Sequence, residues 1–146
     1  MMTRLIVLTV VSFSFLFHSC NHTTNKDKTT PTYTNINASH SFKKGKVVYE
    51  DFCVSCHLPN GEGVPKIFPP LANSDYLMNK RIESIKAIKY GLSGEIEVNG
   101  ETYNSVMLSQ GLSDSEIADV MNYITNSWGN KNTSLITEEE VSKIEP

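Results

Sequence analysis

Two cysteines and a histidine lie within five residues, Cys53-Val54-Ser55-Cys56-His57, and they constrain the fold more than any other feature of the sequence. On a helix, two thiols three residues apart can both reach one edge of a porphyrin and add to its two vinyl groups. The adjacent histidine then presents an imidazole to the iron from the same side. The pattern C-x-x-C-H therefore predicts one covalently attached haem, haem c.

Three other interpretations of the cysteine pair remain open. A redox-active pair of the thioredoxin type needs a preceding strand in a βαβ unit, whereas segment 42–52 has a helical pattern. A structural zinc site needs four ligands, and after residue 40 only Cys53, Cys56 and His57 are cysteine or histidine, so carboxylates would have to complete it. A disulfide between Cys53 and Cys56 explains nothing about His57.

Haem iron commonly takes a second axial ligand, and no histidine follows His57. Met121 belongs to an apolar helical stripe and Met78 lies at an apparent helix start, so both are expected to pack in the core or at the surface. Met107 lies in segment 104–111, which has neither helical nor strand periodicity. Because a loop can place a thioether against iron more easily than a packed helix can, we expect His57 and Met107 as the two iron ligands. Such ligation raises the reduction potential relative to two nitrogen ligands.

The first 19 residues have the features of an export signal. Arg4 precedes an apolar run, residues 5–17, that is shorter than the roughly 20 residues a membrane-spanning helix needs. Cys20 follows the small residue Ser19, as in a bacterial lipoprotein signal, where the cysteine is lipidated and becomes the first mature residue. Cleavage elsewhere and an uncleaved anchor are the alternatives. We therefore expect an exported lipoprotein, anchored to a bacterial membrane on its periplasmic side.

Composition limits the remaining possibilities. Residues 20–40 are rich in threonine and asparagine and nearly devoid of aliphatic side chains, which predicts a flexible tether. The 146 residues, 39% of them hydrophobic, suffice for one domain with a packed core. A net charge of −3 argues against general nucleic-acid binding, although basic residues cluster at 43–46 and 80–89. If Cys20 carries lipid and the C-x-x-C pair carries haem, none of the three cysteines is left as a free thiol.

The predicted elements are mainly helices. One helix is expected to end near the cysteine pair, and a second to cover residues 74–90, with Ser74 or Asn73 as its cap. A third starts at Ser113, which forms a capping box with Glu116, and is expected to stop at Gly129.

Two smaller elements complete the prediction. Segment 95–103 alternates apolar and charged residues around Asn99-Gly100, a strong two-residue turn signal, and so predicts a small β-hairpin. Because it leads directly to Met107, the hairpin is expected near the distal side of the haem. Residues 130–146 are expected to form a tail or a short helix, with Thr137 and Glu140 as a second possible capping box.

The motif, a Pro-x-Leu sequence at residues 69–71 and the C-terminal segment 111–130 resemble class I cytochromes c, which carry one haem. The resemblance covers residues 41–129 and implies the mainly α class I fold. It also implies that the carbonyl of Pro69 accepts a hydrogen bond from His57, and that Met107 is the distal ligand. The proline that often follows that methionine is replaced here by Leu108.

The same resemblance implies that the first and last helices cross. In the family a glycine of one helix faces an aromatic residue of the other, and Gly45 and Tyr49 match on the first helix, with Val120 and Tyr123 on the last. A glycine inside a helix costs about 1 kcal/mol relative to alanine. Close approach of the two helices would explain why Gly45 stands there.

With both axial positions filled, the resemblance implies a one-electron carrier with no catalytic residue and no small-molecule substrate. We expect a membrane-tethered cytochrome that shuttles electrons between redox partner proteins of a respiratory chain. The alternative is a dedicated subunit of an oxidoreductase complex such as a nitrite reductase, a terminal oxidase or a dehydrogenase, because similar C-terminal segments occur in domains partnered with such enzymes. A haem sensor or peroxidase with an open sixth position is the third hypothesis.

Overall fold

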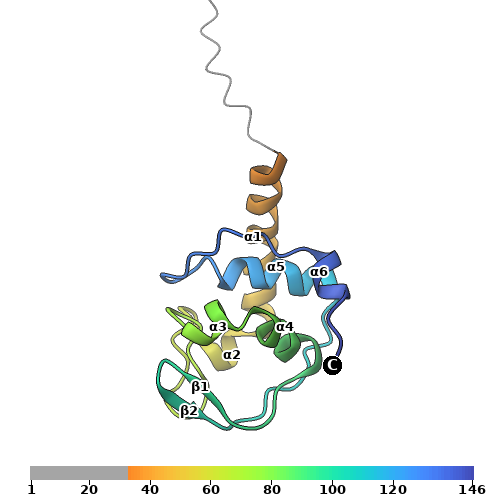
Figure 1. The fold of residues 1–146 in the computed structure, drawn as a ribbon. Coiled ribbons are helices and arrows are strands. Elements are labelled where there is room, and N and C mark those ends of the chain that lie inside the picture. Colours follow the sequence, from red (N-terminus) through yellow and green to blue (C-terminus); the bar gives the residue numbers. More distant parts are fainter. Residues whose placement is uncertain (1–32) are drawn as a thin grey trace, which may run out of the picture.

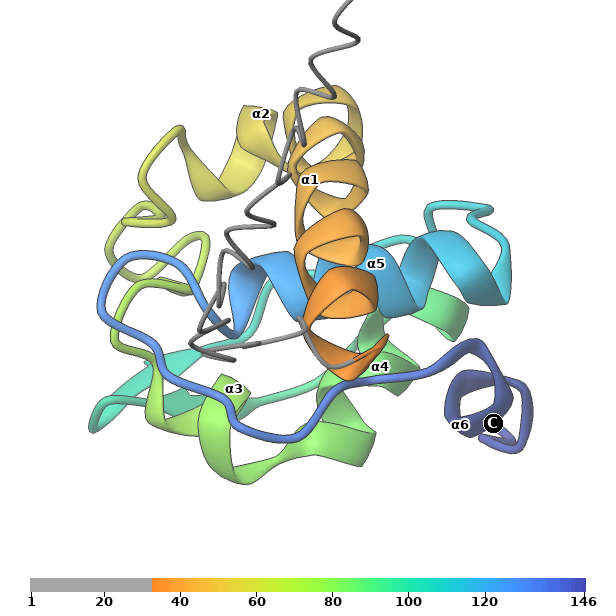
Figure 2. The same cartoon turned by 90° about the horizontal axis from the view of Figure 1, so that it is seen from above.

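The computed structural model describes residues 33–146, so the expected signal, Cys20 and tether residues 20–32 lie outside the described residues. Six helices and two strands follow one another within residues 33–146, in the order α1–α2–α3–α4–β1–β2–α5–α6. Helix α1 projects from one end of the molecule, and the β1–β2 hairpin lies at the other end (Figure 1). The view turned by 90° shows α1 lying across α5 (Figure 2).

Helices α1 (Tyr33–Phe52) and α5 (Asp114–Ile124) form the principal helix pair. A Cβ atom on Gly45 would overlap the backbone carbonyl of Asp119 and lie 2.9 Å from the Cβ of Tyr123. Only glycine allows the two helices to approach this closely, which confirms the predicted role of Gly45. The hydroxyl of Ser41 adds a hydrogen bond across the crossing, donating to Asp119 Oδ1 at 2.5 Å.

Aromatic rings pack beside this crossing. Tyr123 of α5 contacts both Phe42 and Tyr49 of α1, with ring centroids 5.0 and 5.5 Å apart. Trp128, beyond the end of α5, lies 4.9 Å from Tyr49. These separations and tilts are the ones that aromatic pairs favour. The cluster therefore fixes the last turns of α1, just before the cysteine pair.

Helix α5 begins as predicted but ends early. Ser113 and Glu116 form the complete capping box. The helix stops at Ile124 with Thr125 as its C-cap, so Gly129 is not the stop. The reason is local, because the Thr125 hydroxyl donates to the Met121 carbonyl at 2.6 Å and later polar side chains bond the next carbonyls. Such side chains compete with the backbone donors that would continue the helix.

The predicted helix over 74–90 is two helices, α3 (Asp75–Asn79) and α4 (Arg81–Tyr90). Ser74 is the cap, its hydroxyl oxygen accepting from the Leu77 backbone N–H at 3.2 Å. The chain changes direction at Lys80, where φ is −117° and ψ is 56°. No proline or glycine marks this break. The change of direction lets Leu77 of α3 and Ile85 of α4 both enter the same core.

The predicted hairpin is confirmed. Strands β1 (Ile96–Val98) and β2 (Glu101–Tyr103) pair antiparallel, with Val98 opposite Glu101 and Ile96 opposite Tyr103. Asn99 and Gly100 both have positive φ, 53° and 79°, as a two-residue hairpin turn of this type requires.

The C-terminal segment contains a short helix, one of the two forms expected for residues 130–146, and this helix packs against the rest of the domain. Helix α6 (Glu138–Ser142) packs against α5 and buries Val141, while Ile136 before it is also buried. Arg81 of α4 holds this segment through two bonds of 2.6 Å to the Glu140 carboxylate. That carboxylate therefore does not close the proposed capping box, and only the Thr137 half of it is formed.

Helix α1 starts at Tyr33, so residues 33–40 are helical and the predicted tether is too long at that end. Residues 39 and 40 are exposed. Extending an existing helix costs much less than starting one. Within the described part of the chain, no helix combines the length and apolar composition needed to cross a membrane.

Gly45→Ala tests the crossing. Alanine is the better helix former by about 1 kcal/mol, yet the added methyl group forces α1 and α5 apart. We therefore expect the free energy of unfolding to fall by about 1–3 kcal/mol. Urea titrations followed by circular dichroism measure this loss, with Lys46→Ala at the neighbouring exposed position as control. A Gly45→Ala protein as stable as its parent would contradict the close approach.

Candidate functional site

The C-x-x-C-H motif lies where α1 gives way to the short helix α2 (Val54–His57). Cys53 continues the hydrogen bonding of α1, its N–H donating to the Tyr49 carbonyl at 2.9 Å, and its own carbonyl accepts from His57 at 2.9 Å. The Tyr49 hydroxyl donates to the Leu58 carbonyl at 2.6 Å and so ties the end of α2 back to α1. The two thiols and the imidazole are thus carried on one rigid corner.

His57 is held in one orientation by a backbone group. Its Nδ1 lies 3.0 Å from the Pro69 carbonyl oxygen, which is the predicted contact. Because a carbonyl can only accept, Nδ1 carries the proton and Nε2 keeps its lone pair. Burial lowers the pKa of His57, while the bond to Pro69 acts in the opposite direction. Burial thus favours the neutral imidazole, the form in which histidine binds metals.

An apolar cavity opens beside this corner. One part, of about 620 Å³ including its mouth, is lined by Cys53, His57 and side chains of α3, α4, β1 and α5. A second part, of about 800 Å³, is lined by Cys56, His57 and residues of the loop after β2. The two parts share five residues, namely His57, Pro69, Leu92, Ile96 and Met107, and so form one continuous slot.

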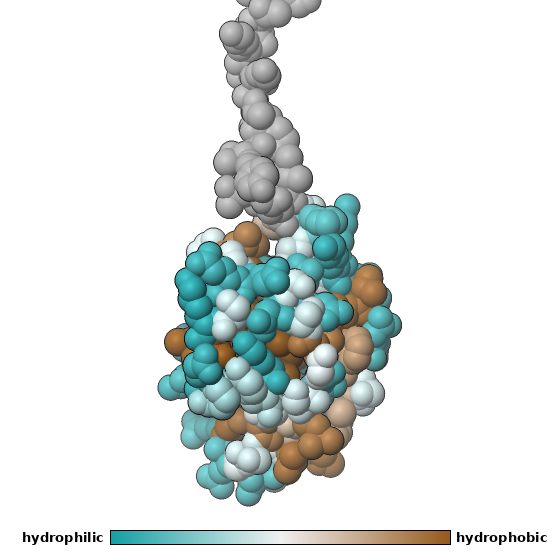
Figure 3. Space-filling model, turned by 90° about the vertical axis from the view of Figure 1, so that its right-hand side faces the viewer, coloured by the Kyte–Doolittle hydropathy of each residue, from teal (hydrophilic) through white to brown (hydrophobic). Residues whose placement is uncertain are grey.

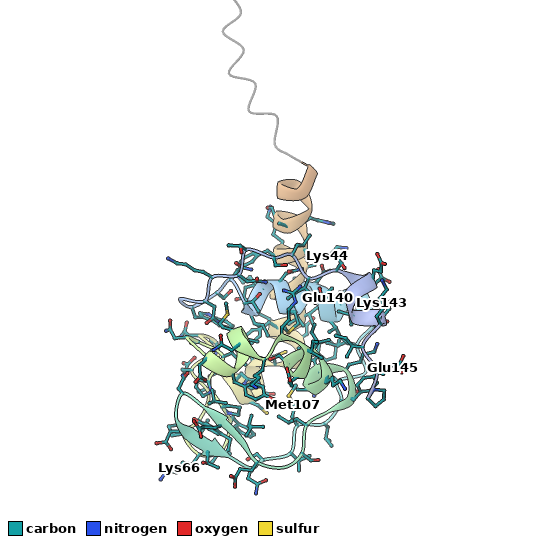
Figure 4. All side chains as sticks on the ribbon, viewed as in Figure 1. Lys44, Lys66, Met107, Glu140, Lys143 and Glu145 are labelled. Carbon is teal, nitrogen blue, oxygen red and sulfur yellow. The ribbon has the colours of Figure 1, made fainter. Side chains whose placement is uncertain are left out.

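Met107 lies on the wall that both parts share, in the lower half of the molecule (Figure 4). Two backbone bonds to Leu92, of 2.7 and 2.9 Å, fix its position, and the Ser109 hydroxyl donates to the Lys89 carbonyl at 2.8 Å. Met121 lines only the first part, from the fully buried face of α5, and Met78 is absent from the residues that line either part. Of the three methionines, the one on the loop is therefore shared by both parts of the slot.

The residues present fit a large, mostly apolar, covalently attached group. Cys53 and Cys56 are both free cysteines and both line the slot, one in each part. Ser84 of α4 also lines it, and its hydroxyl is buried without a hydrogen-bond partner among the described residues. A buried polar group without a partner is uncommon in a folded protein, and a polar atom of a bound group would satisfy it. Sequence reasoning did not single out Ser84, because one serine on an amphipathic helix carries no signal of its own.

The other interpretations of the cysteine pair find no support in this geometry. Burial and the neighbouring Cys56 raise the pKa of the Cys53 thiol to about 11, whereas redox-active pairs need a thiolate at neutral pH. The pair follows a helix rather than a strand, and neither cysteine is in a disulfide. Within residues 33–146, no three histidine, cysteine or carboxylate side chains come together as a metal site.

Comparison with known proteins agrees with the geometry. A family model described as Cytochrome c matches residues 42–128. Cytochrome c-552 of Thermus thermophilus is 44% identical over 101 residues, which cover 63% of this chain and 77% of that protein. The cytochrome c subunit of the quinone alcohol dehydrogenase of Gluconacetobacter polyoxogenes is 34% identical over 104 residues, which cover 68% of this chain but 22% of that subunit.

Gly63→Ala tests the support of the histidine. Gly63 has φ of +63°, and a Cβ there would overlap the Phe68 carbonyl oxygen and lie 2.7 Å from the Pro69 carbonyl oxygen. The substitution therefore displaces the segment that carries the acceptor of the His57 bond. Gly111→Ala is the matched control, because its φ is +68° and nothing lies within 4 Å of the added Cβ. Both variants should lose stability because alanine is strained at positive φ. Urea titrations should show that the free energy of unfolding falls by about 1–3 kcal/mol more in Gly63→Ala than in Gly111→Ala. Equal losses for the two variants would contradict the proposed contact.

Proposed function

The chain belongs to the cytochrome c family, and from that premise we propose that it is a membrane-tethered one-electron carrier that holds its haem c through Cys53, Cys56, His57 and Met107. The mainly helical fold with its small hairpin is consistent with the class I fold. One observation carries the assignment of these residues. The C-x-x-C-H corner and Met107 line the same apolar slot.

Each residue has a distinct role in this proposal. The two thiols become thioethers, which fix the cofactor in an exported protein that could otherwise lose it. His57 binds through Nε2, and Pro69 keeps that nitrogen turned to the slot by accepting the Nδ1 proton. Met107 would supply the second protein ligand to the iron, from the loop after β2.

Haem c supplies one-electron chemistry between Fe(III) and Fe(II). The chain's own part is to hold the group, to exclude water and to set the potential. The walls are almost entirely apolar, including Leu77, Ile88 and Val98, and such surroundings limit solvent access and tune the potential. With His57 and Met107 both bound to the iron, no ligand position would remain for a substrate, which agrees with an electron-transfer domain that is not itself catalytic.

An optical spectrum combined with peptide mass analysis tests the central assignment. A thiol that adds to a vinyl group loses no atoms, so the peptide containing Cys53 and Cys56 should be heavier by the full mass of one haem. The native protein should then show no titratable thiol at either cysteine. A free thiol at Cys53 or Cys56, or haem removed by acid and organic solvent, would overturn double attachment.

Met107→Ala tests the second ligand. We expect the ferric protein to lose its long-wavelength sulfur-to-iron band, the reduction potential to fall, and the ferrous protein to bind carbon monoxide. Met78→Ala is the control, because Met78 does not line the slot and should leave all three properties unchanged. If the parent protein already binds carbon monoxide without losing a ligand, the haem sensor or peroxidase hypothesis is favoured instead.

The proposal of a membrane tether rests on the sequence around Cys20. Twelve residues separate Cys20 from Tyr33, and a chain of that length spans at most about 40 Å, so a lipidated Cys20 would keep the domain close to a membrane. We expect Cys20→Ser to move the protein from the membrane to the soluble fraction, and His22→Ser to leave it in place. Retention of Cys20→Ser in the membrane, or an N-terminus other than a lipid-modified Cys20, would contradict the lipoprotein proposal.

A dedicated subunit of a dehydrogenase complex is the second candidate. It is favoured by the relatives named as cytochrome c subunits of quinone alcohol dehydrogenase, although the chain spans only about a fifth of them. Purification from mild detergent separates the two candidates. A shuttle emerges alone, whereas a subunit emerges with a large partner in fixed ratio.

A further inference from the structure

The charges of this domain are unevenly distributed along the chain. The two stretches that carry the motif and the loops around the slot, residues 53–79 and 91–113, hold five carboxylates and a single cation, Lys66. Most of the other basic residues lie on α1, α4 and the C-terminal segment. Lys44 and Lys143 lie in the upper half of the molecule, away from Met107 (Figure 4). Arg81 and Lys89 are moreover paired with Glu140 and Asp114.

The mouth of the slot has an exposed apolar surface. Val106 and Leu108 line the larger part of the slot and are 66% and 73% exposed. Ile67 precedes Phe68, another lining residue, and is 50% exposed. Hydrophobic side chains also gather at the lower end of the molecule in the space-filling view (Figure 3). Large apolar side chains grouped on a surface mark interaction sites more often than scattered ones do.

Three carboxylates lie on the hairpin that forms one wall of the slot. Glu95 and Glu97 flank Ile96, which lines both parts of the slot, and Glu101 lies opposite Val98 on the paired strand. All three carboxylates are exposed, and none forms an ion pair among the described residues. These three carboxylates belong to the hairpin whose Ile96 and Val98 line the slot, and Lys66, which precedes Ile67, is the one cation in the same stretches.

We propose that Val106, Leu108 and Ile67, together with Glu95, Glu97 and Glu101, form a docking surface for a protein whose contact face is apolar and rimmed by lysine and arginine. The inference rests on the proposed function, since it places the partner where the haem slot opens. The apolar centre supplies affinity, and the carboxylates steer approach and reject acidic surfaces. An anionic lipid surface is disfavoured by the same three charges.

Two small oxidants of opposite charge probe this surface on the reduced holoprotein. The cation tris(phenanthroline)cobalt(III) combines positive charge with apolar rings, and the anion tris(oxalato)cobaltate(III) has the opposite charge. Each accepts one electron and becomes cobalt(II), and stopped-flow absorbance measures the rate. In Glu95→Gln/Glu97→Gln, we expect about threefold to tenfold slower oxidation by the cation at low ionic strength and faster oxidation by the anion. The control Glu138→Gln/Glu145→Gln makes the same change of net charge far from the hairpin and should alter both rates much less.

The apolar part of the surface is tested separately. In about 1 M salt the screening length is only about 3 Å, so the hairpin variants should match their parent. Leu108→Ser should still slow the phenanthroline complex by about twofold or more, because apolar contact is not screened. Poly-L-lysine, a basic probe of protein size, should inhibit oxidation of the parent by the cation more than that of the hairpin variant.

The outcomes separate this inference from the proposed function. If the holoprotein has the expected spectrum and is oxidised normally, but both charge variants behave alike, the docking surface is wrong and the electron carrier stands. Equal inhibition of parent and hairpin variant by polylysine would also overturn the docking surface. A protein without attached haem, or without reversible reduction, would overturn the proposed function itself.

Discussion

The rest of the structure depends on the close crossing of α1 and α5 at Gly45. That contact fixes the orientation of α1, and Cys53 directly follows the last residue of this helix. It also fixes α5, whose inner residues Val120 and Ile124 form a wall of the slot. The cysteine pair and the opposite wall are thus positioned by a single helix contact, which is why a methyl group at residue 45 is expected to disturb both.

The slot lies within the hydrophobic core, and core side chains form its walls. Leu77, Ile88, Val98 and Val120 belong to the buried core and also face the cavity, so a bound apolar group would complete their packing. In this setting the His57–Pro69 bond has a second effect beyond orientation. The bond gives Nδ1 a hydrogen-bond partner, while Nε2 remains available to a ligand. Both ring nitrogens of His57 are therefore paired once Nε2 is bound.

Local signals in the sequence predicted the elements that local chemistry controls. The Ser113–Glu116 capping box and the Asn99-Gly100 turn are found as expected, because each depends on residues within four positions of one another. Distant contacts decide the other features, apart from the early end of α5, which the polar side chains after Ile124 explain locally. The break at Lys80 has no local cause, and the segment after residue 129 is held by Arg81, some sixty residues earlier in the chain.

The sequence by itself determined the chemistry, since Cys53, Cys56 and His57 lie so close in the chain that any helix through them presents two thiols and an imidazole together. It also ranked Met107 first among the methionines, because that segment lacked periodicity. Only the tertiary structure brought Met107 to the cavity that His57 lines, and only it brought strand β1 of the acidic hairpin to the same cavity. The physical reason is the same in both cases. Which surfaces face one another depends on how helices cross and loops close, and no short stretch of sequence contains that information.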